Sequence, residues 1–389
     1  MTAGLAQDAP PQEPTSRVVQ VDADHLQPLA EIIRQAWDPK ATPERVRASR
    51  AAAAALNPHG AGTDLPTFLF LMNGRPLGHL TTIPVNLTVG DAVHPAHWFK
   101  GFWVVPEHRN GPVGFLLLRE ALRHLQTTLS MVVQPAPRRL FQSLGLRDFG
   151  QIPNFVRVLR PGRVLRRINF SEQGLAIGPS WARPVAKLAT APGFAQAIGL
   201  AAAAALKTWT LRQPGRRGVA EISPQSLEPG EVDRLWQRVS TGMAAPLRDY
   251  AHVQSRYVSK GATYTALVAR DGGELSGLAL IRRPRESGDP RLSGIRMATL
   301  SDLVFPPDQP QTGMRLLAAA ERAALDLGAD ALLCSPSHST MQPLMRARGY
   351  VRLGGNVHFM ARAAGFDLDG LELTDWWLMR ADGEADDAL

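Results

Sequence analysis

The spacing of hydrophobic and polar positions changes in a regular order along the first half of the chain. Apolar residues three to four apart predict helices, whereas strict alternation or a short apolar run predicts strands. The predicted order is helices first, then a meander of strands, then an alternation of helix and strand. The elements are a strand at 17–21, helices at 24–37 and 43–56, strands at 67–72, 77–89 and 98–105, a helix at 113–125, a strand at 129–134, a helix at 137–144 and a strand at 154–159.

The second half of the sequence has the same order of elements. The predicted elements are a strand at 219–222, helices at 230–239 and 249–260, strands at 263–269, 275–282 and 296–305, a helix at 312–327, a strand at 331–335, a helix at 341–348 and a strand at 357–361. Particular residues repeat as well: Leu117 and Leu118 precede Leu316 and Leu317 by 199 positions. We interpret this as an internal duplication of one α/β (α+β, mixed-sheet) domain.

A chain of 389 residues is long enough to bury two cores of ordinary size. We predict a disordered tail at 1–16, because this stretch is rich in proline and lacks the apolar run of a signal peptide. The predicted domains are 17–160 and 218–365. A basic, partly helical linker at 161–217 joins them, and 366–389 form a second tail.

Positive charge is concentrated in the middle of the chain. The net charge is +8, but residues 151–218 hold eleven Arg and Lys against Glu172 alone, which gives this segment +10 and leaves −2 for the rest. Any attraction to an anionic partner therefore belongs to this segment. Within it, residues 188–206 carry no charge, which leaves three interpretations open: a helix packed between the domains, an interfacial helix on anionic lipid, or a membrane span.

The single cysteine, Cys334, excludes an internal disulfide and a multi-cysteine zinc site. We predict that it is a small buried apolar residue. No spacing of His, Asp or Glu is typical of a metal site, and no Ser-His-Asp arrangement is present, so we predict no metal.

The residues that most strongly suggest a binding site lie at 104–114, where a predicted strand leads into a turn that contains glycine and then into an apolar helix. The free N–H groups at a helix start favour a diphosphate, and small residues let it approach the backbone. This stretch resembles the acyl-CoA loop of the Gcn5-related N-acetyltransferase (GNAT) superfamily, in which Val-x-Pro is followed by Arg or Gln, two residues, Gly, one residue, and Gly or Ala. Pro112 departs from the pattern at the first glycine. The resemblance implies a cofactor site made of Val104, Val105, Arg109, Asn110, Gly111, Val113 and Gly114.

The second half departs further from the family loop. Of residues 308–313, only Gly313 matches, and Asp308 stands where the family has Arg or Gln. A carboxylate at this position would repel a diphosphate. We therefore expect the acyl-CoA site in the first half and a degenerate domain in the second. The resemblance extends over residues 17–160 and 218–362.

The resemblance also implies a direct attack of an amine on the thioester, with a base for the amine and often a tyrosine for the leaving thiolate. The tyrosine position is held by Phe141 in the first half and by Met345 in the second, and neither donates a proton. The candidate bases are His97, Lys100 and Glu107, and His97 has the ordinary pKa closest to neutral pH. Each has a plain alternative: His97 and Lys100 as surface residues, and Glu107 as a carboxylate near the helix dipole.

The C-terminal residues 376–386, two tryptophans followed by acidic residues, resemble the ending of bacterial tandem GNAT-like proteins linked to surface polysaccharide production. The alternative is that the aromatic residues dock on the last domain and the acidic end is solvated.

The sequence therefore predicts an acyltransferase that uses acetyl-CoA or another acyl-CoA and transfers the acyl group to an amine of a small molecule or cell-envelope precursor. One alternative is a binding or scaffold protein that has lost both active sites. Another is an aminoacyl-tRNA-dependent transferase, for which the basic segment would hold the RNA; sparse aromatic residues in that segment argue against nucleic acid. We expect a cytoplasmic protein, or one attached peripherally to the inner membrane through residues 157–217.

Overall fold

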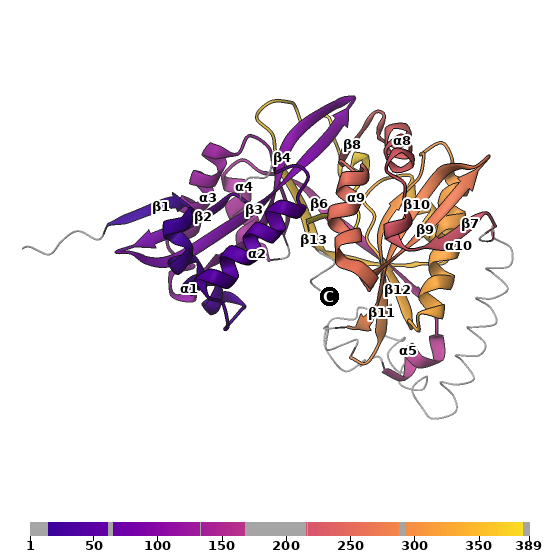
Figure 1. Ribbon diagram of the computed structural model, residues 1–389, viewed down its shortest axis with the longest axis horizontal. Coiled ribbons are helices and arrows are strands. Elements are labelled where there is room, and N and C mark those ends of the chain that lie inside the picture. The colour runs from indigo at the N-terminus through magenta and orange to yellow at the C-terminus, as the bar shows by residue number, and fades with distance from the viewer. Residues whose placement is uncertain are drawn as a thin grey trace, which may run out of the picture. The chain divides into compact units, whose positions relative to one another are not determined.

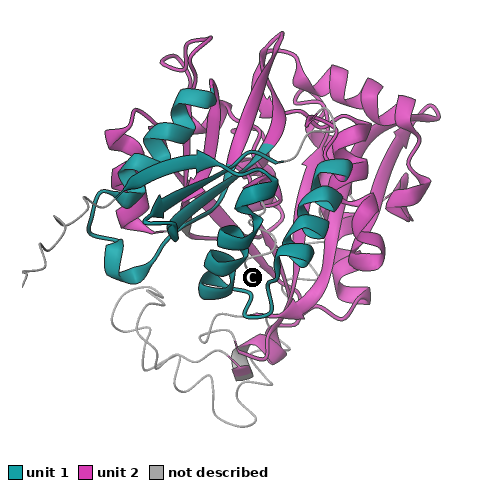
Figure 2. Cartoon of the chain, turned by 60° about the vertical axis from the view of Figure 1, so that its left-hand side comes forward, with its two compact units in different colours: residues 1–55, 62–83, 99–125 teal, residues 56–61, 84–98, 126–389 magenta. Residues whose placement is uncertain are grey.

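The computed structural model describes residues 15–60, 65–132, 134–167, 215, 217–287 and 293–383. Packing divides the chain into two compact units (Figure 2), whose helices and strands are labelled in Figure 1. Unit 1 contains residues 1–55, 62–83 and 99–125, and unit 2 contains residues 56–61, 84–98 and 126–389. Strands β3 (Arg75–Gly90) and β4 (Ala92–Val104) contribute residues to both units.

Unit 1 contains β1, β2 and parts of β3 and β4, which are neighbours in this order in the sheet. Strands β1 (Ser16–Gln20) and β2 (Thr67–Met72) are antiparallel, and β2 is antiparallel to β3. Its helical elements are η1 (Ala23–His25), α1 (Leu26–Ala36), α2 (Pro43–Leu56), η2 (Pro106–His108) and α3 (Val113–His124), of which α2 ends one residue into unit 2. The apolar face of α1 packs with β2 in one buried cluster that includes Leu29, Ile32 and Leu69. The 3.6-residue spacing in α1 therefore produces the packing that it predicts.

Unit 2 contains a mixed sheet whose strands run in the order β5, β13, β6, β12, β11, β10, β9, β7. The strands are β5 (Thr128–Val132), β6 (Arg147–Val158), β7 (Val219–Ile222), β8 (Met243–Pro246), β9 (Tyr264–Asp271), β10 (Glu274–Glu286), β11 (Arg296–Val304), β12 (Ala331–Cys334) and β13 (Val351–Arg362). The pairs β11–β12 and β4–β5 are parallel, whereas β12–β6, β6–β13, β13–β5, β11–β10, β10–β9, β9–β7 and β8–β3 are antiparallel. The predicted mixed-sheet α/β class is confirmed.

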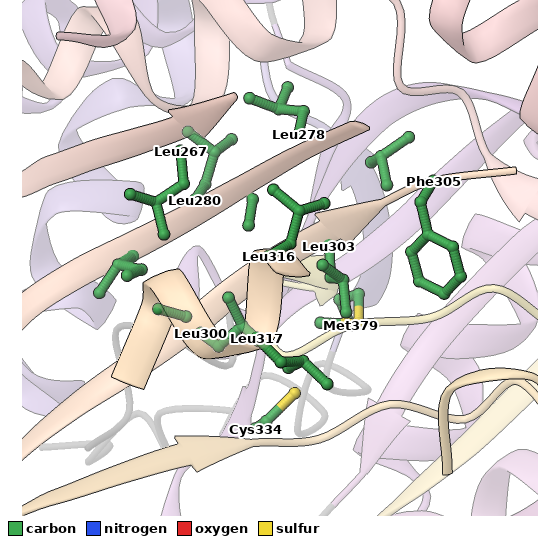
Figure 3. Close-up of a cluster of buried hydrophobic side chains, with 14 of the residues drawn as sticks. Leu267, Leu278, Leu280, Leu300, Leu303, Phe305, Leu316, Leu317, Cys334 and Met379 are labelled. Atoms are coloured by element: carbon green, nitrogen blue, oxygen red, sulfur yellow. The ribbon is translucent and has the colours of Figure 1, made fainter. Parts of the chain in front are cut away.

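The helical elements of unit 2 lie between these strands along the chain. They are α4 (Pro135–Ser143), α5 (Pro161–Arg167), η3 (Pro224–Ser226), α8 (Pro229–Ser240), α9 (Tyr250–Arg256), η4 (Val258–Thr263), α10 (Pro310–Asp326), α11 (Met341–Ala347) and η6 (Leu373–Asp375). Buried leucines of β9, β10, β11 and α10 form the centre of the core (Figure 3). Cys334 is buried in the same cluster, which confirms the prediction for this residue.

The closing strands of the two sequence halves are exchanged. By sequence, β6 closes the first half and β13 the second, yet β13 pairs with β5 and β6 pairs with β12. The two closing strands also pair with each other. One sheet therefore contains the last strands of both halves. The domains at 17–160 and 218–365 stay a prediction.

Several arginines at the start of the basic segment have partners within unit 2. Arg157 is buried and donates to the Gly349 carbonyl oxygen, 3.1 Å away. Arg160 donates to the carbonyl oxygens of Leu325 and Gly328 at the end of α10, at 3.1 and 3.3 Å. Arginine commonly satisfies the last carbonyl groups of a helix in this way. Most of the predicted linker, including residues 188–206, lies outside the described residues, as do residues 1–14 of the predicted disordered tail.

The segment after β13 packs into unit 2. Trp376, Trp377, Leu378 and Met379 are fully buried, so the expected docking of the aromatic residues is confirmed. The expectation of a solvated acidic end is wrong for Asp382, because this carboxylate is buried and lies 2.6 Å from the Arg248 guanidinium.

Candidate functional site

The turn between β4 and α3 is organised by its own backbone. Pro106 begins the short helix η2, and the amide of His108 donates to the Val105 carbonyl oxygen at 2.9 Å. The amides of Arg109 and Gly111 donate to Pro106 and His108 at 3.3 and 3.1 Å. These three amides are therefore used within the turn and are not the ones offered to a ligand.

The first turn of α3 offers three other amides. The helix begins at Val113, and its first amide bonded to a preceding carbonyl is that of Leu116, which donates to Pro112 at 2.9 Å. The N–H groups of Val113, Gly114 and Phe115 precede it and have no carbonyl in the helix to bond. Residue Pro112 has no side-chain oxygen to cap them. The start of α3 therefore combines free amides with the positive end of the helix dipole.

Proline at position 112 leaves the N–H donors of the first turn of α3 in place. Pro112 is the residue before the helix and has φ −77° and ψ −7°, so its backbone already follows the helical course. The N–H that proline lacks would belong to this preceding residue, whereas the amides of the first turn follow it. The departure from the family glycine therefore removes no donor from the first turn itself.

Arg109 is held beside this turn by the end of β4. Its Nε donates to the Val104 carbonyl oxygen at 3.1 Å, and its guanidinium lies 5.9 Å from the centre of the Trp103 ring. The side chain is exposed, and it has no carboxylate partner in the part of the chain that the structure describes. A guanidinium that is positioned but not paired with an acid can bind an anion.

The other predicted cofactor residues lie in the same stretch. Val104 and Val105 are buried, and the Val105 amide donates to the Leu77 carbonyl oxygen at 2.9 Å. Asn110 and Gly111 are exposed in the turn. Their contact with a cofactor remains a prediction, in which the valines would shape the turn and the exposed residues would meet the ligand.

The predicted bases do not all belong to one unit. His97 lies on the part of β4 that belongs to unit 2, where its amide donates to the Thr127 carbonyl oxygen at 3.0 Å. Lys100 and Glu107 are exposed residues of unit 1. The structure therefore brings Lys100 and Glu107 into one unit and places His97 in the other.

The surroundings of His97 change its pKa. Burial lowers its pKa below the ordinary value, because the charged imidazolium would lose its hydration. Its Nδ1 is buried and has no hydrogen-bond partner among the described residues. The ring is therefore neutral at pH 7, which is the protonation state that a general base requires.

Sequence reasoning missed a second histidine, His79 on β3 in unit 1. Burial lowers its pKa to about 4, and its Nδ1 has no partner in the described chain. Its ring lies 4.9 Å from that of Trp37, and its Nε2 is 3.4 Å from the point that a Cβ on Gly101 would occupy. Gly101 has φ +64° within β4, a conformation that favours glycine. A glycine in the middle of a predicted strand was the available signal.

The corresponding turn of the second half is filled by protein. A Cβ added to Gly313 would lie 2.7 Å from Leu344 and 2.8 Å from Phe305. Thr312 and Gly313 are buried in the first turn of α10, and Asp308 before it is exposed. The positions expected to hold a proton-donating tyrosine are occupied by Phe141 and Met345, which are both buried.

The described residues contain no group of three His, Cys, Asp or Glu side chains that could hold a metal ion. A search of the same residues for membrane spans finds no helix with the length and hydrophobicity to cross a bilayer.

Comparison with known proteins finds likeness in structure. No family model matches the sequence, and no curated protein matches it. A conserved protein from Enterococcus faecalis V583, described as a probable N-acyltransferase, has 11% identity and a TM-score of 0.53, with 90% of this chain and 72% of that chain covered. A GCN5-related N-acetyltransferase from Kribbella flavida has 15% identity and a TM-score of 0.52, covering 90% and 71%.

Saccharomyces cerevisiae N-myristoyltransferase, solved with bound myristoyl-CoA, has 12% identity and a TM-score of 0.53, with 92% of this chain and 88% of that chain covered. At these identities the likeness is one of fold. The chain therefore has the fold of GCN5-related acyltransferases over most of its length.

Proposed function

We propose that the protein is an acyl-CoA-dependent N-acyltransferase whose diphosphate site is the turn at residues 109–114. The observation that carries the proposal is a turn that joins two kinds of anion-binding group: three amides at the start of α3 with no bonded carbonyl among the described residues, and Arg109, whose guanidinium has no carboxylate partner among them. An anion at this place would meet backbone donors, a helix dipole and a guanidinium together. The shared fold with an N-myristoyltransferase that binds myristoyl-CoA supports an acyl-CoA as that anion.

In this proposal the residues of the chain bind the acyl-CoA and accept one proton from the amine. Arg109 and the amides of Val113 and Gly114 would bind the diphosphate, and a bound acyl-CoA would supply the acyl group. The amine nitrogen forms a bond to the thioester carbonyl carbon, and the carbon–sulfur bond breaks to release CoA. A base would accept the proton from the amine; of the predicted candidates, Lys100 and Glu107 belong to the same unit as the turn. We propose an amine of a small molecule or cell-envelope precursor as the acceptor.

The proposal is tested by calorimetry of the full-length protein with acetyl-CoA and longer acyl-CoAs. We expect Arg109→Glu to weaken binding at least tenfold, about 1.4 kcal/mol, because it replaces the guanidinium with a repelling carboxylate. Arg75→Glu is the matched control, since it reverses an exposed charge of unit 1 at the β2–β3 hairpin. An unfolding midpoint equal to that of the wild type would show that Arg109→Glu leaves the fold intact.

The absence of binding at millimolar acyl-CoA would contradict the proposal. It would favour the second candidate, a binding or scaffold protein with this fold. The buried Phe141 and Met345 at the two tyrosine positions support that candidate, because neither can protonate a leaving thiolate. Binding that Arg109→Glu leaves unchanged would place the cofactor elsewhere and would contradict the site.

A further inference from the structure

Strands β11 and β12 are paired over only part of their length. Their parallel register runs from Met297 opposite Ala331 to Leu300 opposite Cys334. Strand β12 ends there, whereas β11 continues to Val304. On its other edge β11 stays paired with β10 up to Val304. We call the region between residues 301–304 and residues 335–337 the β11–β12 fork. Buried backbone groups on the facing edge of β11 need other partners there.

The C-terminal segment, residues 376–382, supplies partners for β11. The Ala381 amide donates to the Ser301 carbonyl oxygen at 3.2 Å, and the Trp377 indole Nε1 donates to the Leu303 carbonyl oxygen at 3.0 Å. Both carbonyl groups belong to the part of β11 that lies beyond its pairing with β12. The C-terminal segment therefore lies along β11 where β12 has ended.

The same segment bonds to the other arm of the fork. The Ser337 amide donates to the Leu378 carbonyl oxygen at 3.1 Å, and the Leu378 amide donates to Ser337 Oγ at 2.9 Å. Arg380 donates to Ser335 Oγ at 3.4 Å. Because it is bonded to both arms, the C-terminal segment occupies the fork itself and does not merely cover it.

Apolar side chains complete the filling. Trp377 lies 5.4 Å from the Phe305 ring and 4.9 Å from the His338 ring. Met379 belongs to the same buried cluster as Leu303 and Cys334, which Figure 3 shows around the fork. All of these aromatic and sulfur-containing side chains except His338 are buried.

A buried ion cluster holds the end of the segment. Arg248 donates from Nε to the two carboxylate oxygens of Asp302 on β11, at 3.0 and 3.1 Å, and from a terminal nitrogen to Asp382 at 2.6 Å. Tyr257 donates to Asp302 at 3.2 Å, and the Met379 amide donates to Asp382 at 2.7 Å. Withdrawing the segment would leave Arg248 with one carboxylate partner fewer in a buried place, which is strongly unfavourable.

We propose that residues 376–382 are a permanent internal occupant of the β11–β12 fork, so that the second half of the sequence is closed to acyl-CoA and the chain holds one acyl-CoA site. The identity of the excluded ligand rests on the proposed function; the occupation of the fork does not. The packed first turn of α10, where Gly313 meets Phe305 and Leu344, closes the same half at its helix start.

Hydrogen–deuterium exchange of the full-length protein tests the occupation. Without ligand, we expect the amides of residues 376–382 to exchange as slowly as those of β11. Exchange at the rate of an unstructured peptide would overturn the proposal. With saturating acetyl-CoA, we expect changes at residues 109–116 and none at residues 301–305 or 376–382. Loss of protection at 376–382 on binding would make the segment a displaceable lid and would also overturn it.

Point variants test what holds the segment. Asp382→Asn removes one partner of Arg248 and is expected to speed exchange at residues 376–382 at least about tenfold. The control Asp308→Asn removes an exposed carboxylate of the same unit and should leave that exchange unchanged. Trp377→Phe keeps an aromatic side chain but removes the indole N–H that donates to Leu303, so this variant replaces Asp382→Asn in the test if Asp382→Asn fails to fold. Wild-type exchange in both variants would overturn the assigned role of these contacts.

Counting sites completes the test. Calorimetry should give one acyl-CoA per chain for the wild type and for Asp308→Asn; a second equivalent in either would overturn the closure of the second half. If no acyl-CoA binds at all, the proposed function fails, while the ligand-free exchange experiment still decides whether the fork is occupied.

Discussion

At the scale of single residues, the chain buries polar groups whose protonation is fixed by their surroundings. His79 lies on β3, and its ring is close to Gly101 and to the Trp37 ring. Burial is what lowers its pKa. Burial alone therefore keeps it neutral, in contrast to Arg248, which stays charged because two carboxylates neutralise it.

His79 makes stability depend on pH in a predictable direction. Its pKa is about 4 in the folded chain and 6.5 ordinarily, so the unfolded chain takes up its proton first as the pH falls. Above pH 6.5 the ring is neutral in both states and the free energy of unfolding is at its full value. Between pH 6.5 and pH 4 the free energy of unfolding falls by about 3 kcal/mol in all. We expect His79→Gln to remove this part of the acid dependence, measured by urea unfolding from pH 7 to 4.

The control for this experiment is His124→Gln, which replaces an imidazole of the same unit whose side chain is 51% exposed. Its unfolding curves should shift with pH in parallel with the wild type. If the free energy of unfolding of His79→Gln changed with pH as much as that of the wild type, the explanation by burial of a neutral ring would be wrong.

At the scale of elements, the two halves repeat the same contact between a strand and a helix. A Cβ on Gly78 of β3 would meet Val113 and Leu117 of α3 at 3.0 and 3.5 Å. A Cβ on Gly277 of β10, 199 positions later, would meet Thr312 and Leu316 of α10, which also lie 199 positions later. The repeat seen in the sequence is therefore a repeat of packing, in which a glycine lets the helix approach the sheet.

The second copy of this contact is the tighter one. The Cβ of Gly277→Ala would lie 2.7 Å from Thr312 and 2.8 Å from Leu316. We expect Gly277→Ala to lower the free energy of unfolding by about 1–3 kcal/mol through overpacking. Gly354→Ala is the control, because nothing lies within 4 Å of its added Cβ. Equal unfolding midpoints for the two variants in urea would show that α10 moves away from the sheet without cost.

At the scale of the whole chain, the exchanged closing strands join the two sequence halves in unit 2. Strand β13 lies between β5 and β6, and β6 lies between β13 and β12. Neither half can complete its sheet without a strand of the other. This arrangement predicts that a destabilising change in one closing strand lowers the protection from hydrogen exchange in the strands of both halves.

Phe359 on β13 tests this coupling. Its buried ring packs with Trp98, Phe149 and Trp376, at centroid distances of 6.1, 5.4 and 4.7 Å. We expect Phe359→Ala to cost about 3–5 kcal/mol and to speed hydrogen exchange in both β5 and β12. Val351→Ala, at a position of β13 that is 55% exposed, is the control and should change neither. Loosening of β5 alone would contradict the coupling.

Local pattern predicted most elements and part of the site. The strand at 67–72 and the helix at 43–56 have the predicted bounds, because the first is a short continuous apolar run and the second is an alanine-rich run that begins at a proline. The helix start at Val113 is also as predicted. The pattern missed β8, which has only four residues and ends in proline. It also extended α9 to residue 260, although the helix ends at Arg256, ahead of Gly261 with φ +57°.

The sequence by itself determined the order of elements, their repetition and the place of the turn before α3, since all three are written in residues close together in the chain. The tertiary structure alone decided which closing strand pairs with which, that His79 is buried and His97 half-buried, and that Asp382 reaches Arg248. The hydrophobic patterns of the two closing strands are similar, so they do not show which partner each strand takes. Likewise, the sequence does not show whether an aspartate is solvated or buried. Only contacts between distant residues distinguish these outcomes.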